Sequence, residues 1–131
     1  MTNIPQTYLD HLNAITADAN PEKLRDVWEV DGVLEFPYGQ SLGIAPRVEG
    51  IDAIIEYFSG LGYFRDFTFS NMRGWPIADA PEYVVEMHGS ATLVQSGNPY
   101  EQDYIVRFGV GPSQKLSWMR EYWDPTRVGS N

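Results

Sequence analysis

The run LSWMREYW at residues 116–123 constrains the fold more than any other stretch, because its side chains divide into two sets at a period of two. A β-strand directs successive side chains to opposite faces of its sheet, whereas a helix would mix the two sets. We therefore predict a strand that carries one set on each face: Leu116, Trp118, Arg120 and Tyr122 against Ser117, Met119, Glu121 and Trp123.

Glu121 is the candidate functional residue of this strand, because it lies between Met119 and Trp123 on the face expected to be mostly buried. Burying a carboxylate is costly unless it is hydrogen-bonded, and burial raises its pKa by favouring the neutral form. A carboxyl group of this kind can take and return a proton near neutral pH. The alternative is that Glu121 faces solvent or pairs with an arginine such as Arg120 or Arg107.

Apolar residues recur at helical spacing in the first half of the chain and at strand spacing in the second half. Helices followed by hairpins are typical of an α+β fold, with the helices on one face of an antiparallel sheet. A strongly twisted sheet around three helices leaves a cone, whose open end is a natural ligand cavity. The predicted order is a helix at 4–18, a short helix at 20–28, a strand at 30–36, a loop at 38–47, a helix at 50–61, and four strands at 67–76, 83–94, 100–110 and 116–123.

Composition narrows the classes of function. The 131 residues are enough for one domain, which we place at 1–131. The net charge of −9 disfavours a nucleic-acid partner and an anionic membrane surface. The chain has no cysteine, and its two histidines lack the spacing of a metal site, so we expect neither a disulfide nor a bound metal. No apolar run is long enough to span a membrane and we see no signal peptide, so we expect a cytoplasmic protein.

Four segments together resemble the SnoaL-like branch of the nuclear transport factor 2 and ketosteroid isomerase superfamily. They are VWEVDGVLEFPYG (27–39), VEGIDAIIEYFSGL (48–61), the hairpin GNPYEQDYIVRF (97–108) and MREYWDPTRV (119–128). The resemblance implies a cone-shaped α+β fold of the cystatin-like barrel type. In that fold a strongly curved mixed or antiparallel sheet wraps around three helices from the N-terminal half. It also implies a homodimer formed through the outer face of the sheet.

The resemblance covers several reactions. Ketosteroid isomerases carry their general base just before the proline of the first strand, where this chain has Phe36 with Glu35 beside it. The acid that binds the oxyanion in those enzymes is matched by Tyr104. Steroid isomerisation is therefore not expected. Members similar to limonene epoxide hydrolase use an acid at the place of Glu121 with an arginine that the strand at 83–89 lacks. Phenazine-biosynthesis A/B-type proteins have a glutamate at the place of Glu121.

We therefore predict a small-molecule pocket protein that acts without a cofactor, as an acid/base enzyme of isomerase or cyclase type, on a small apolar or aromatic metabolite. The alternatives are a non-catalytic binding module and an epoxide-hydrolase-like hydrolase. Which face of residues 83–94 lines the pocket, and whether Glu35 or Phe36 faces it, stays open. The expected site consists of Glu121 as acid/base, Tyr104 or His88 polarising an oxygen, and ligand contacts from Met119, Trp123, Phe36, Phe108, Tyr38 and Glu35.

Overall fold

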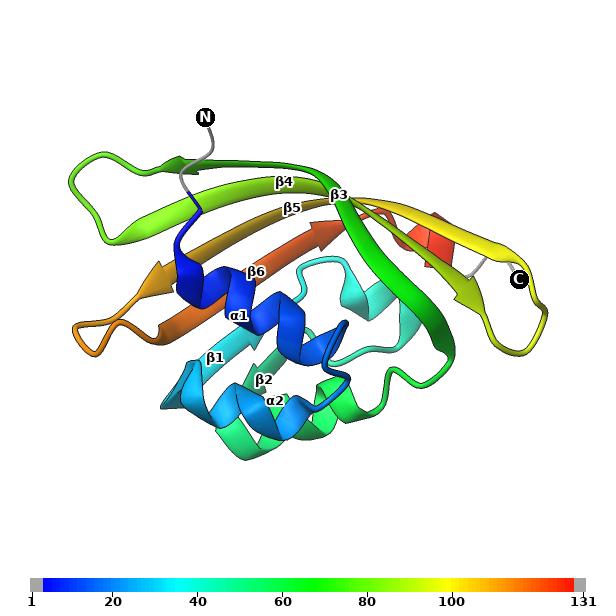
Figure 1. The fold of residues 1–131 in the computed structure, drawn as a ribbon, viewed down its shortest axis with the longest axis horizontal. Helices are drawn as coiled ribbons and strands as arrows, with labels where there is room; N and C mark the ends of the chain where they lie inside the picture. Colours follow the sequence, from blue (N-terminus) through cyan, green and yellow to red (C-terminus); the bar gives the residue numbers. More distant parts are fainter. Residues whose placement is uncertain (1–3, 129–131) are drawn as a thin grey trace.

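The computed structural model describes residues 4–128 and confirms the predicted α+β class (Figure 1). Helices dominate the first half, and long strands joined by hairpins make up the second half. In chain order the elements are α1 (Gln6–Ile15), the 3₁₀ helix η1 (Pro21–Asp26), β1 (Trp28–Glu35), the 3₁₀ helix η2 (Gly39–Leu42), β2 (Arg47–Glu49), α2 (Ile51–Ser59), β3 (Phe64–Pro76), β4 (Glu82–Leu93), β5 (Pro99–Val110), β6 (Leu116–Trp123) and α3 (Pro125–Val128).

The six strands form one mixed sheet in the order β2-β1-β6-β5-β4-β3. β1 and β6 are parallel, and the other neighbouring strands are antiparallel. The sheet is strongly curved, and α1 and α2 lie on one of its faces (Figure 1). That face therefore holds the core, while the other face carries polar and charged side chains. None of the helices within residues 4–128 is long and apolar enough to cross a membrane.

The core forms where the strand registers align large apolar residues under the helices. Met119 of β6 lies opposite Leu34 of β1 on one side and Phe108 of β5 on the other, and all three are fully buried. The ring of Tyr8 on α1 stacks on Phe108 with the centroids 4.6 Å apart. Burying each such side chain contributes about 1.5–3 kcal/mol, so these contacts fix α1 against the middle of the sheet.

The edge strand β3 bends because it contains two irregular positions. Asp66 and Asn71 have positive φ angles of 57° and 54°, and the pairing with β4 shifts register at both places. Asp and Asn tolerate this left-handed conformation better than other residues with a side chain, and such bulges bend a strand. The bend carries Phe67, Phe69 and Met72 to the helical side of the sheet, where they line a cavity.

Three local predictions need correction. The second helix is a 3₁₀ helix that ends at Asp26, so Trp28 begins a strand rather than ending a helix. The predicted loop at 38–47 runs into the short strand β2, which pairs with β1 and is too brief to show a period. Leu116 is fully buried on the side of Met119, because a register shift against β5 interrupts the alternation at the start of β6.

Candidate functional site

A cavity of about 920 Å³ lies between the helices and the sheet. Its volume is in the range of small-molecule sites. The turn after α1 and the end of α2 form one side, and β3 to β6 form the other. Among its lining residues are Leu9, Leu12, Asn13, Thr16, Tyr57, Phe58, Phe64, Asp66, Phe67, Phe69, Met72, Met87, Tyr100, Tyr104, Glu121 and Trp123.

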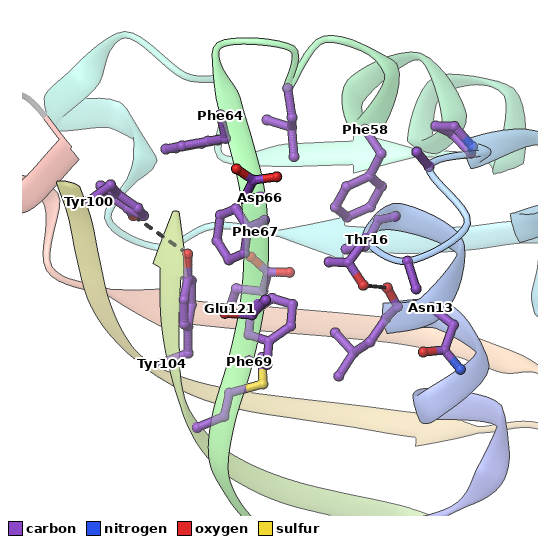
Figure 2. Close-up of a pocket in the computed structure, with 18 of the residues that line it drawn as sticks. Asn13, Thr16, Phe58, Phe64, Asp66, Phe67, Phe69, Tyr100, Tyr104 and Glu121 are labelled. Atoms are coloured by element: carbon purple, nitrogen blue, oxygen red, sulfur yellow. Dashed lines mark hydrogen bonds between the residues drawn. The ribbon is translucent and has the colours of Figure 1, made fainter. Parts of the chain in front are cut away.

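The lining is mostly aromatic and aliphatic, with few charged groups. Glu121 and Asp66 are carboxylates, and the described lining includes no lysine, arginine or histidine. The Asp66 side chain is 82% exposed, so it lies at the solvent-facing rim of the cavity. Figure 2 shows Glu121 extending from β6 into the cavity. An anionic ligand would meet two carboxylates there, and the nearby guanidinium group of Arg65, which is outside the lining, is paired with Asp66 at 3.6 Å.

Glu121 is the strongest candidate for acid/base chemistry in this cavity. Within residues 4–128 its carboxyl group forms no hydrogen bond or ion pair, and the half-buried side chain lies among the aromatic rings of the cavity. Burial raises the pKa of Glu121 to about 7, because the charged form loses its hydration without gaining a partner. Near neutral pH both the acid and the carboxylate are therefore populated.

Two tyrosines of the lining are neutral hydrogen-bond donors near this carboxyl group. Burial raises the pKa of Tyr57, and the neighbouring Glu121 adds to the effect. Burial likewise raises the pKa of Tyr104, followed by the effects of Tyr100 and Glu121. The hydroxyl groups of Tyr100 and Tyr104 lie 3.5 Å apart (Figure 2). Both Tyr57 and Tyr104 therefore keep their protons at any physiological pH.

The structure places some of the predicted residues in the cavity lining and others in the core beside it. Glu121, Tyr104 and Trp123 line the cavity. Phe36, Phe108 and Met119 point to the same side of the sheet, but each is fully buried in the core and does not border the cavity. Of the pair left open by the sequence, Phe36 rather than Glu35 faces inward.

His88 lies on the opposite face of the sheet, so its expected place beside Glu121 is corrected. On β4 the residues facing the core include Val85 and Met87, and Met87 borders the cavity. The His88 ring forms hydrogen bonds of 2.8 Å with Asp103 and 2.6 Å with Glu101 on the outer face of β5. These bonds raise the pKa of His88, Asp103 having the larger effect.

Glu35 and Tyr38 also lie away from the cavity. The Glu35 carboxylate accepts hydrogen bonds from Arg120 at 3.0 Å and from Arg47 at 3.1 Å, on the outer side of β1. Tyr38 is 53% exposed and packs edge-on against Tyr122 with the ring centroids 6.0 Å apart. Neither is among the lining residues.

Several residues that shape the site are not among those predicted from the sequence. Tyr100 and Gln102 alternate with Tyr104 along β5, so the period of two already placed them on the same face. Phe67 and Phe69 were predicted only as strand residues. Asp66 reaches the rim through a bulge, for which the sequence carries no regular signal. Within residues 4–128, no group of three His, Cys, Asp or Glu side chains is arranged to hold a metal ion.

Comparison with solved structures identifies the class of fold. A candidate isomerase from Bacillus subtilis aligns with a TM-score of 0.82 at 23% identity, over 95% of this chain and 91% of that one. A protein with a ketosteroid isomerase-like fold from Catenulispora acidiphila, solved with trimethylamine, aligns with a TM-score of 0.80 at 12% identity, over 98% and 92%. The phenazine biosynthesis-related protein PhzB2 from Pseudomonas aeruginosa aligns with a TM-score of 0.76 at 19% identity, over 94% and 76%. The molecule thus has the cone fold of the ketosteroid isomerase-like and nuclear transport factor 2-like proteins.

The sequence assigns the chain to one family within this fold. The SnoaL-like domain family matches residues 6–117, which is most of the chain. The protein therefore belongs to the SnoaL-like domain family, as the resemblance of its segments indicated. A search of curated proteins finds no match.

Proposed function

We propose that this protein binds a small, neutral, largely apolar or aromatic molecule in the cavity and moves a proton on it, without a cofactor. The observation that carries the proposal is the unpaired carboxyl group of Glu121, which lies in an aromatic cavity and has a pKa of about 7. General acid/base catalysis is most efficient when the pKa of the group is close to the working pH. The fold alone would not choose this reaction.

The proposed step transfers a proton between the ligand and Glu121. The Glu121 carboxylate takes a proton from a carbon next to a carbonyl group, and the electron pair of the broken C–H bond moves to the carbonyl oxygen as an enolate forms. Tyr104 donates a hydrogen bond to that oxygen, where negative charge develops. Glu121, now a carboxylic acid, returns the proton to the same or another carbon, so no oxidant or reductant is consumed.

The charge of the lining supports a neutral ligand. Glu121 and Asp66 are both acidic and no basic side chain is part of the described lining. A carboxylate or phosphate ester would therefore be buried without a counter-ion, which is costly.

The experiment uses 2-acetylnaphthalene, a neutral aromatic ketone small enough for a cavity of about 920 Å³. Its methyl hydrogens are next to the carbonyl group, and their replacement by deuterium in heavy water is measured by NMR. We expect the protein to accelerate this exchange and Glu121→Gln to abolish the acceleration. Glu86→Gln is the matched control, because Glu86 lies exposed on the outer face of β4.

Two other outcomes would change the assignment. Binding of the ketone without any exchange, retained in Glu121→Gln, would identify a binding module. Incorporation of labelled water into an epoxide such as styrene oxide, lost in Glu121→Gln, would identify a hydrolase. Equal exchange rates in the protein and in Glu121→Gln would reject the role proposed for this carboxyl group.

We also propose a homodimer formed through the outer face of the sheet. On that face the guanidinium carbons of Arg107 and Arg120 lie 5.7 Å and 5.4 Å from the centroid of the half-buried Trp118 ring, and Ile105 is 47% exposed. Tryptophan and arginine are enriched at interfaces. Sedimentation should show a dimer that Ile105→Glu weakens and that Val30→Glu, at an exposed position of β1, leaves intact. The cytoplasmic location stays a prediction, to be checked by cell fractionation.

A further inference from the structure

The side-chain amide of Gln102 is fully buried, and the backbone around it determines which way it is turned. Its Oε1 accepts hydrogen bonds from the backbone N–H of Asp124 at 3.0 Å and of Asp103 at 3.1 Å. Its Nε2 donates to the Asp124 carbonyl at 2.8 Å. A flipped amide would place donors against donors and acceptor against acceptor, so only one orientation fits.

This orientation makes Gln102 a donor toward the tyrosines of β5. Besides the Asp124 carbonyl, Nε2 donates to the hydroxyl oxygen of Tyr100 at 3.3 Å. Tyr100 also borders the cavity, but it is only 4% exposed and more buried than Tyr104, so an acceptor within the protein best satisfies its hydroxyl hydrogen. The acceptor within reach is the hydroxyl oxygen of Tyr104, 3.5 Å away. The Tyr104 hydrogen is then left to point elsewhere.

Tyr104 borders the cavity, and within residues 4–128 its hydroxyl group has no hydrogen bond besides the one with Tyr100, so this last hydrogen is available to a molecule in the cavity. The arrangement that satisfies every hydrogen runs from Gln102 to Tyr100, then to Tyr104, then to the ligand. Each bond in such a chain polarises the next and strengthens it. In the reverse arrangement Tyr104 would donate to Tyr100, and the more buried of the two hydroxyl groups would have to find its acceptor in the cavity.

We propose that Gln102 is a positioning residue that sets the direction of this chain of hydrogen bonds, so that Tyr104 presents a hydrogen to the ligand. The pocket therefore selects neutral molecules with a hydrogen-bond acceptor oxygen, such as ketones. The inference rests on the proposed ligand site and extends it in two ways. It assigns a function to a buried residue that touches no ligand, and it predicts that the pocket prefers acceptor-bearing ligands even where no proton is transferred.

The test compares two ligands of nearly the same shape. 2-Acetylnaphthalene has a carbonyl oxygen where 2-isopropenylnaphthalene has a CH₂ group, and neither is charged. Their dissociation constants are measured by fluorescence titration, and the carbonyl stretching frequency of the bound ketone is measured by infrared spectroscopy. We expect the protein to prefer the ketone by about two- to tenfold, the contribution of one neutral hydrogen bond.

Four variants distinguish an effect on the chain of hydrogen bonds from a general effect on the pocket. Tyr104→Phe should abolish the preference, because it removes the donor. Tyr100→Phe and Gln102→Met should lower the preference by at least half and raise the carbonyl frequency toward its value in Tyr104→Phe. General loosening of the pocket would weaken both ligands equally and leave their ratio unchanged. Tyr83→Phe is the control, because Tyr83 stacks on Phe108 away from the cavity.

The result that would overturn the inference is full ketone preference and an unchanged carbonyl frequency in both Tyr100→Phe and Gln102→Met, with loss in Tyr104→Phe. Tyr104 would then donate without direction from Gln102. Should Gln102→Met fail to fold, Tyr100→Phe alone decides, because it removes the middle of the chain while keeping the ring. Failure of the proposed ligand site looks different, since neither naphthalene would then bind the unmodified protein.

Discussion

The indole nitrogen of Trp28 donates a hydrogen bond of 3.1 Å to Nδ1 of His11. The two residues join the start of β1 to the middle of α1, and each is only 1% exposed. Because Nδ1 accepts this bond, the neutral ring carries its hydrogen on Nε2, and protonating Nδ1 would break the bond inside the core. Burial lowers the pKa of His11 to about 3. His11 is thus a structural residue whose charge state is coupled to folding.

His11 and Glu121 should have opposite effects on stability between pH 4.5 and pH 6.5. His11 has a lower pKa in the folded state, about 3 against 6.5, so its contribution is complete above pH 6.5 and is lost as the pH falls. Glu121 has a higher folded-state pKa, about 7 against 4.5, so its contribution is complete below pH 4.5 and is lost as the pH rises. Each slope is about 1.4 kcal/mol per pH unit, so in this window they nearly cancel.

Glu121→Gln should therefore expose the slope of His11. We expect the free energy of unfolding of this variant to rise by about 1.4 kcal/mol per pH unit, relative to the unmodified protein, between pH 4.5 and pH 6.5. Urea unfolding at pH 4.5, 5.5 and 6.5 measures it. Glu86→Gln, on the outer face, controls for the loss of a carboxylate. Parallel curves for the protein and Glu121→Gln would show that folding does not change the pKa of Glu121.

Gly89 keeps space for two rings of the cavity wall. A Cβ atom at this position of β4 would lie 2.7 Å from Cε2 of Tyr104 and 3.0 Å from Cε1 of Phe67. We expect Gly89→Ala to displace both rings, to lower the free energy of unfolding by about 1–3 kcal/mol, and to weaken binding of 2-acetylnaphthalene. In Gly60→Ala the nearest atom would lie at 3.4 Å, so neither quantity should change much. Unaltered binding in Gly89→Ala would mean that these rings do not contact the ligand.

Glu35→Gln tests the residue that was expected at the pocket and is found outside it. The change weakens the ion pairs of Glu35 with Arg120 and Arg47, which are partly exposed to solvent. Such pairs contribute up to about 1 kcal/mol, so we expect a small loss of stability and no change in affinity for 2-acetylnaphthalene. A tenfold loss of affinity with an intact fold would show that Glu35 contributes to ligand binding after all.

The period of the strands predicted much of the site. Alternation in residues 116–123 separated Glu121 and Trp123 from Arg120 and Tyr122, and the structure keeps these sets apart, although Leu116 lies on the side of Met119. A period of two cannot say which set faces the helices unless one set is clearly more apolar. In β4 the set with Val85, Met87 and Leu93 is clearly the more apolar, and it is the set that faces the core. His88 belongs to the other set, so its expected place in the cavity went against the period of this strand.

Other parts of the site depend on features without a sequence period. The bulges at Asp66 and Asn71 change the direction of β3, and their left-handed conformations are available to these residues without being required by them. The parallel pairing of β1 with β6 joins distant parts of the chain. Gln102 appears on the buried face of β5 as an ordinary polar residue, and its orientation depends on the Asp124 backbone beyond the end of β6.

The pKa of Glu121 is the central quantity. It can be measured by ¹³C NMR on protein labelled at the glutamate side-chain carboxyl carbons, with the Glu121 signal assigned by its loss in Glu121→Gln. We expect this signal to titrate with a midpoint of about 7, because the carboxyl group is buried in the cavity without a partner. A midpoint near 4.5, the ordinary value for a glutamate, would show a solvated carboxylate and contradict the proton transfer proposed for it.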